Sequence, residues 1–131
     1  MNVGSQLPPE IEAVSTVLID SAFKVHQSLG PGLLESVYQT CLCIELDNRG
    51  VAYETQVPIP IVYEGIDAGT GLRLDLLVEK NLIVEIKALE QILPIHQSQL
   101  LTYLKLANLR LGLLINFNVV LFKQGIKRII R

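Results

Sequence analysis

The sequence predicts an α/β fold in which a mixed β-sheet is flanked by helices. Apolar residues recur every three or four positions in three stretches, which is typical of amphipathic helices. Elsewhere apolar and polar residues alternate or form short apolar runs, as they do in strands. The order is helix, helix, three strands, helix and strand, followed by a small hairpin. A strand joined through a helix to the next strand favours a partly parallel sheet. We expect residues 1–131 to form a single domain.

The first two helices are separated by a glycine-proline-glycine break at Gly30–Gly32. Pro8 and Pro9 predict the start of the first helix, because proline suits a first turn whose amides have no helical partner. His26 falls one position off the apolar stripe, so we expect it at the surface or the boundary of the core. The second helix should run from Leu33 to Arg49 and end at Gly50 as a C-terminal cap. Its expected inner side is formed by Leu34, Val37, Tyr38, Cys41, Leu42 and either Glu45 or Leu46.

Three strands are predicted next. Residues 51–63 alternate, and Pro58 and Pro60 indicate that the second half lies at an edge or leaves the ladder. Residues 64–71 contain three glycines and are expected to form a loop. A hairpin follows, with a polar turn at Glu79–Asn81. One face should carry Leu72, Leu74, Leu76 and Val78, followed after the turn by Leu82, Val84 and Ile86.

This hairpin brings two acids together. If Val78 pairs with Leu82, Asp75 lies opposite Glu85 on the same face, and Lys87 projects from that face two residues later. Carboxylates whose Cβ atoms are about 5 Å apart repel each other unless a positive charge lies between them. Mg²⁺ prefers such hard oxygen ligands, and this set of groups suits phosphodiester hydrolysis. A solvent-facing hairpin with scattered charges is the other interpretation.

The remaining elements are a helix, a central strand and a hairpin. The helix is expected from Pro94 to Asn108, with an inner stripe through His96, Gln99 or Leu100, Tyr103, and Leu106 or Ala107. Gln99 and Tyr103 are four positions apart, so they either lie at the rim of the core or serve a site; His96 is better explained as a helix-start residue. The apolar run 111–117 predicts a strand covered on both faces. The hairpin is expected at 119–122 and 126–130.

Composition limits the class of protein. Only 18% of residues are charged, against about 25% in typical domains, so a large core and a buried subunit interface are expected. No apolar run approaches the ~18 residues of a membrane span, and residues 1–10 lack the features of a secretory signal. We therefore expect a cytoplasmic protein. Cys41 and Cys43 would point about 200° apart on a helix, which favours buried thiols over a zinc site.

The net charge of −2 conceals an uneven distribution. Residues 1–67 contain nine acids and two bases, whereas residues 68–131 contain four acids and nine bases. The C-terminal half is therefore suited to contact a polyanion. An ordinary solvated basic tail explains the same distribution equally well.

Five sequence blocks, in this order, resemble those of the PD-(D/E)XK nuclease superfamily. Gly32–Tyr38 (GLLESVY) is similar to the motif that names the GxxExxY family within it. The other blocks are Arg73–Asp75, Val84–Lys87, Gln99–Tyr103 and Gly112–Phe117. Leu74 departs from the proline of the superfamily name, at a position that carries no ligand. The likeness extends from about Ile19 to Ile130, nearly the whole chain.

The resemblance implies a restriction-endonuclease-like core and a nuclease that hydrolyses DNA phosphodiester bonds with a metal-activated water. It implies that Mg²⁺, with Mn²⁺ as a substitute, is held by Asp75, Glu85 and the backbone carbonyl of Ile86. Lys87 would position or activate the attacking water. Glu35 would hold the metal's water shell or a second ion, and Gln99 and Tyr103 would orient the site or the phosphate. A small acidic nuclease of this kind is expected to act as a homodimer or in a larger complex. A catalytically inactive interaction or assembly domain with the same fold is the alternative.

Overall fold

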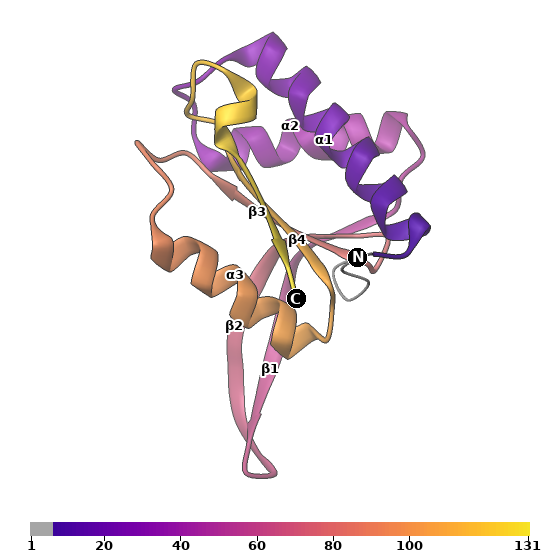
Figure 1. Ribbon diagram of the computed structural model, residues 1–131, viewed down its shortest axis with the longest axis vertical. Coiled ribbons are helices and arrows are strands. Elements are labelled where there is room, and N and C mark those ends of the chain that lie inside the picture. The colour runs from indigo at the N-terminus through magenta and orange to yellow at the C-terminus, as the bar shows by residue number, and fades with distance from the viewer. Residues whose placement is uncertain (1–6) are drawn as a thin grey trace, which may run out of the picture.

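The computed structural model describes residues 7–131 and contains a five-stranded sheet in the order β1-β2-β3-β4-β5. Strands β3 and β4 are parallel and the other neighbours are antiparallel. Helices α1 and α2 lie against one face and α3 against the other (Figure 1). The predicted mixed sheet flanked by helices is confirmed. The elements are α1 Pro9–Leu29, α2 Glu35–Asn48, β1 Tyr53–Tyr63, β2 Ile66–Val78, β3 Leu82–Lys87, α3 Pro94–Ala107, β4 Leu111–Asn116, η2 Phe122–Gly125 and β5 Ile126–Ile130.

Two expectations concern a secretory signal and membrane-spanning helices. The expectation that residues 1–10 carry no secretory signal falls mainly on residues 1–6, which lie outside the described part of the chain. Within residues 7–131, no helix combines the length and apolar character that crossing a bilayer requires.

The sheet separates two apolar cores. The larger core joins α1 and α2 to the inner residues of β3, β4 and the end of β2, with Leu18, Leu42, Val84 and Leu113 fully buried. The smaller core joins α3 to the opposite face through Leu100 and Leu104. Strand β4 lies between β3 and β5 and is buried along its whole length. The prediction of a central strand covered on both faces is therefore confirmed.

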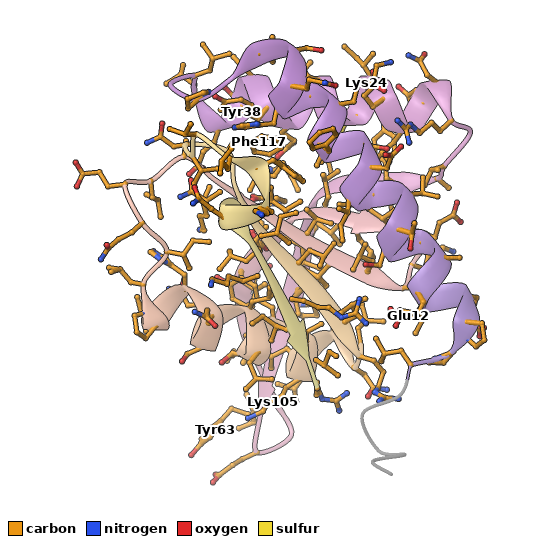
Figure 2. The ribbon with its side chains drawn as sticks, turned by 45° about the horizontal axis from the view of Figure 1, so that its top comes forward. Glu12, Lys24, Tyr38, Tyr63, Lys105 and Phe117 are labelled. Carbon is orange, nitrogen blue, oxygen red and sulfur yellow. The ribbon has the colours of Figure 1, made fainter. Side chains whose placement is uncertain are left out.

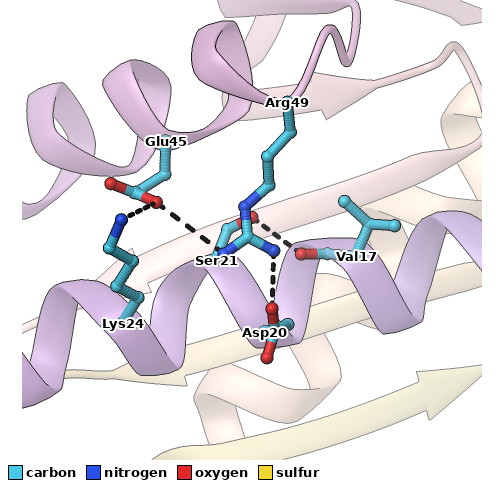
Figure 3. A network of polar contacts seen from close by, with 6 residues as sticks. All are labelled: Val17, Asp20, Ser21, Lys24, Glu45 and Arg49. Carbon is cyan, nitrogen blue, oxygen red and sulfur yellow. Dashed lines mark hydrogen bonds and ion pairs between the residues drawn. The ribbon is translucent and has the colours of Figure 1, made fainter.

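The α1–α2 pair is bounded as the sequence predicts. Pro9 lies in the first turn of α1, and Gly50, at φ +69°, follows the end of α2. The amide of Gly50 donates to the carbonyl of Asp47, and the amide of Val51 donates to the carbonyl of Leu46. These two hydrogen bonds define a Schellman cap. Ion pairs also link the helices: Arg49 contacts Asp20 at 2.6 Å, and Lys24 contacts Glu45 at 3.3 Å (Figure 3).

Three side chains of these helices lie elsewhere than expected. His26 was expected at the surface or the boundary of the core, but it is buried at 7% exposure, and its Nε2 lies 2.7 Å from the carbonyl oxygen of Val119. A contact from a distant loop covers a residue that the helical stripe alone leaves at the margin. Leu34 and Val37 are 73% and 39% exposed, so they do not form part of the inner side of α2. Helix α2 begins only at Glu35, and Leu34 is its extended N-cap.

Strands β1 and β2 form a long hairpin that projects beyond the sheet (Figure 1). The loop expected over residues 64–71 is wrong, because β2 begins at Ile66 and only Glu64 and Gly65 form the turn. Gly71 does not mark a loop: a Cβ there would lie 2.2 Å from the side chain of Ile61 on the paired strand. Strand β1 is an edge strand, as its prolines predict.

The side chains of β2 change face at one position. Leu72 and Leu74 pack with α3, whereas Leu76 and Val78 pack with α1 and α2, so the expected common face is wrong. The change occurs beside Gln56 of β1, whose φ of +50° is left-handed and interrupts the extended pleat. On β3, by contrast, the predicted alternation of the inner residues is confirmed.

The expected C-terminal hairpin is also wrong. Residues 122–125 form the short 3₁₀ helix η2, and β5 pairs antiparallel with β4 instead of with residues 119–122. Gly125 enables this path, because a Cβ there would lie 2.0 Å from the carbonyl oxygen of Asn116. Strand β5 thereby becomes the second edge of the sheet.

Candidate active site at the split between β2 and β3

Asp75 lies where β2 separates from β3. The ladder between these strands ends at the pair Leu76–Val84, so the predicted pair of Asp75 with Glu85 would be the next one beyond its end. Asp75 Oδ2 instead accepts a hydrogen bond of 2.8 Å from the main-chain amide of Ile86. The side-chain carboxylate of Asp75 thus takes the place of a main-chain acceptor in the ladder. This hydrogen bond fixes the carboxylate beside the main chain of Ile86, the residue after Glu85.

Glu85 is a buried acid with an unsatisfied oxygen. Its side chain is 5% exposed, and Oε1 has no hydrogen-bond partner. Burial, followed by the negative charge of Asp75, raises the pKa of Glu85 from 4.5 to about 9, and the ammonium of Lys87 opposes this rise only weakly. Without a bound cation, Glu85 therefore holds a proton at neutral pH.

Tyr103 approaches this acid pair from α3. Burial raises the pKa of its phenol, and the charges of Glu85 and Asp75 raise it further, which places the hydroxyl within their electrostatic reach. Gln99, one turn earlier on the same helix, is exposed. The structure thus brings Tyr103 to the acid pair and leaves Gln99 at the surface of α3.

Glu35 reaches the same region from the first turn of α2. Its Oε1 accepts a 3.3 Å hydrogen bond from the amide of Ala88, just after β3. Together with Asp75 and Ile86 it lines a polar cavity of about 290 Å³. Across residues 7–131, no group of three or more His, Cys, Asp or Glu side chains is arranged to hold a metal ion. Glu35 therefore borders the cavity without joining Asp75 and Glu85 as a third close acid.

Comparison with known proteins places this geometry in context. A model of the PD-(D/E)XK nuclease superfamily matches residues 12–129. The chain belongs to the PD-(D/E)XK nuclease superfamily. This membership indicates nuclease activity on nucleic acid, and nucleases of this superfamily generally use divalent metals. Comparisons with curated proteins and with solved structures found no match.

The acid pair of this PD-(D/E)XK chain is chemically suited to a divalent cation. The available donors are hard oxygens: the carboxylates of Asp75 and Glu85 and the main-chain carbonyl of Ile86. The buried Oε1 of Glu85 has no protein donor, so a cation would supply the missing partner. Lys87 follows on the same strand, within electrostatic reach of Glu85. The residues present therefore fit the metal that the superfamily generally uses.

Several polar residues of the cavity were not predicted from the sequence. Ser36, Gln39 and Thr40 line it from α2, and Gln56 lines it from β1. Gln56 Nε2 donates to Gln39 Oε1 at 3.2 Å, which ties the edge strand to the helix. The α2 residues follow Glu35 at helical spacing, so that spacing was a usable signal, whereas the approach of Gln56 depends on tertiary structure.

Asn116 is another residue that sequence reasoning missed. Its side chain is buried and makes two hydrogen bonds to the main chain of Leu89. Oδ1 accepts from the Leu89 amide at 3.0 Å, and Nδ2 donates to the Leu89 carbonyl at 2.9 Å. Phe117 N–H donates to the carbonyl of Lys87 at 3.0 Å. The segment that leaves β3 is therefore attached to β4. One polar residue within the apolar run 111–117 was the available signal.

Two further polar residues, Tyr38 and His96, have structural roles. Tyr38 is fully buried and stacks on Phe117, with ring centroids 4.5 Å apart (Figure 2). Its hydroxyl donates to the carbonyl of Gly30 at 2.6 Å and accepts from the amide of Leu33 at 3.1 Å, which fixes the turn before α2. His96 Nδ1 accepts from the amide of Leu93 at 2.9 Å, so its prediction as a helix-start residue is confirmed.

The cysteines of α2 offer no metal site. Cys41 and Cys43 are free and partly buried. Burial raises the pKa of the Cys43 thiol, which disfavours the thiolate that metal binding requires.

Proposed function

We propose that this protein is a Mg²⁺-dependent nuclease that hydrolyses phosphodiester bonds of DNA, and that it belongs to the GxxExxY family of its superfamily. The observation that supports the proposal most directly is the unpartnered, buried Oε1 of Glu85 beside the carboxylate of Asp75. A purely structural hairpin gains nothing from two such acids, because burying them together costs free energy that a cation offsets. The motif Gly32–Tyr38 supports the family assignment.

In this proposal, Asp75, Glu85 and the carbonyl of Ile86 hold Mg²⁺, for which Mn²⁺ substitutes. When bound, the cation polarises the phosphoryl group and lowers the pKa of water. Lys87 donates a hydrogen bond from its ammonium group to orient the attacking water, and it neutralises charge that develops on the phosphate. Because Phe117 and β4 hold the main chain of Lys87, the point from which its side chain extends is fixed before substrate arrives.

The remaining site residues have supporting roles in the proposal. Glu35 accepts the amide of Ala88 and faces the cavity, where it holds the water shell of the metal or a second ion. The hydroxyl of Tyr103 and the amide of Gln99 donate hydrogen bonds to the phosphate. Gln99 is exposed, so its contact with the site requires substrate to extend over α3.

DNA is the proposed substrate because the lysines and arginines of the chain are concentrated in its C-terminal half. Residues 68–131 contain nine bases and four acids. The whole chain is nevertheless acidic, so we propose that a homodimer or a larger complex supplies additional DNA affinity. We also propose a cytoplasmic location.

Cleavage assays test the proposal. Plasmid, branched and single-stranded DNA, and a matched RNA, are incubated with the protein in Mg²⁺, Mn²⁺ or EDTA. We expect metal-dependent cutting that falls at least about 100-fold in Asp75→Ala, because ligand loss removes the electrostatic stabilisation of the transition state. Glu54→Ala, at an exposed acid of β1 outside the site, is the matched control and should cut normally. Equal cutting by the native protein and Asp75→Ala would assign the activity to a contaminant.

A catalytically inactive interaction or assembly domain is the second candidate. It is favoured by the large apolar side chains that are exposed on the molecule and by the lack of a three-acid cluster within residues 7–131. Calorimetric titration with Mn²⁺ separates the two candidates. No heat for the native chain, together with unchanged stability of Asp75→Asn, would favour the assembly domain over the nuclease.

A further inference from the structure

The tip of the β1–β2 hairpin, residues 62–67, is apolar and acidic. Val62, Tyr63 and Ile66 are 67%, 68% and 70% exposed, at the end of a two-stranded ribbon that extends away from the helices (Figures 1 and 2). Residues 57–72 contain two acids, Glu64 and Asp67, and no lysine or arginine. This charge disfavours a polyanion as the occupant, and three adjacent exposed apolar side chains are typical of a protein contact.

An apolar groove with an adjacent positive charge lies between α1 and the η2–β5 segment. It has a volume of about 440 Å³ and is lined by Ile19, Phe23, Phe122 and Ile126, with Lys123 also in its lining. Phe23 is 46% exposed and meets Phe122 edge-on, with ring centroids 5.6 Å apart. The groove is thus an exposed apolar surface with an adjacent positive charge.

The charges of the groove complement those of the hairpin tip. Asp20 also lines the groove, but it is paired with Arg49 at 2.6 Å, which offsets its charge (Figure 3). The last nine residues, which begin with Lys123, contain four bases and no acid. An apolar tip that carries the negative Glu64 therefore complements an apolar groove that carries the positive Lys123.

The tip and the groove cannot meet within one chain. The hairpin tip lies at the lower end of the long axis, whereas α1 and η2 lie in the upper half (Figure 1). Two copies related by a two-fold axis perpendicular to the long axis would each have their hairpin tip at the end where the α1–η2 groove of the other copy lies. This arrangement has two-fold symmetry and closes after two copies, so it avoids open-ended filaments.

We propose that the protein forms a two-fold dimer in which the hairpin tip of each copy inserts into the α1–η2 groove of the other. The proposal specifies the interface of the homodimer proposed above and does not depend on nuclease activity. Tyr63 and Ile66, which pair across the two strands and share one face of the ribbon, would fill the apolar groove, and Glu64 would pair with Lys123 of the partner copy.

Sedimentation velocity over a range of concentrations tests the interface. The native chain should form a dimer, and Tyr63→Ser combined with Ile66→Ser should raise the dimer Kd at least 10-fold. Both side chains are exposed, so circular dichroism should show an unchanged fold. Ile44→Ser is the matched control, because Ile44 is 50% exposed on α2 and belongs to neither surface. This variant should dimerise like the native chain.

A charge exchange and a cross-link test the pairing of tip with groove. Glu64→Lys and Lys123→Glu should each weaken the dimer, and the two substitutions together should restore it. A zero-length carbodiimide cross-linker applied to mixed ¹⁴N and ¹⁵N chains should join Glu64 of one copy to Lys123 of another. A dimer that is insensitive to the tip variants would overturn this interface while leaving a homodimer through another face. A monomer at all concentrations would overturn both. Metal-dependent cleavage by that monomer at saturating DNA would still support the nuclease, so the two failures can be told apart.

Discussion

Replacing Glu85 by glutamine should remove a pH dependence from the stability of the metal-free protein. The folded-state pKa of Glu85 is about 9, against 4.5 for the free side chain, because the carboxyl is buried beside Asp75. Between these values the native protein keeps a proton that the unfolded chain releases, so the free energy of unfolding falls as pH rises. The slope is about 1.4 kcal/mol per pH unit, which amounts to roughly 3 kcal/mol between pH 6 and pH 8. Glutamine has no proton to lose and should abolish this contribution.

Urea unfolding followed by circular dichroism in EDTA at pH 6, 7 and 8 measures the effect. The stability of the native chain relative to Glu85→Gln should be greatest at pH 6 and should decline steadily to pH 8. Glu54→Gln, at an exposed position of β1, should retain the pH dependence of the native chain. If the native protein and Glu85→Gln lose stability in parallel across this range, the buried proton does not exist and the reasoning is refuted.

Three other substitutions have expected outcomes. Above about pH 9, where Glu85 is ionised, Asp75→Asn should stabilise the metal-free protein by about 1 kcal/mol in urea, because it removes the charge beside Glu85 and retains an oxygen for the β3 amide; destabilisation at that pH would show that the two acids do not repel. Tyr38→Phe should cost about 1–3 kcal/mol and lower Tm, since stacking persists but the hydroxyl bonds are lost; an unchanged Tm would contradict this. Gly125→Ala should cost about 2 kcal/mol or more by denaturant titration, because its Cβ would collide with Asn116; a neutral result would show that η2 shifts easily.

The sequence predicts much of the fold wherever a local pattern has only one interpretation. Helix α1, the parallel pair β3–β4 and the start of α3 at Pro94 agree with the structure, because helical periodicity, an apolar run and proline are local signals. The register of the β2–β3 ladder, from Leu76 to Val78, also follows from local chemistry. The turn Glu79–Asn81 fixes Val78 opposite Leu82, and each further pair then follows by counting.

The errors arise where distant contacts decide the outcome. Residues 64–71 look like a loop because of their glycines, yet Gly71 is needed for the close approach of Ile61 on the paired strand. His26 is buried by the carbonyl of Val119, which is 93 residues away in sequence. The cavity wall at Gln56 depends on a left-handed backbone that residue type does not reveal. Periodicity describes one element at a time, so it cannot anticipate these three contacts.

The amide of Asn116 has a consequence for how this protein can be altered. Because its oxygen accepts from the amide of Leu89 and its nitrogen donates to the carbonyl of Leu89, the main chain that follows Lys87 is attached to the neighbouring strand β4. Substituting aspartate would keep the size of the side chain but lose the donor, leaving the carbonyl of Leu89 without its Asn116 partner. Position 116 is therefore the place at which a substitution could shift the lysine by a fraction of an ångström without changing any acidic residue.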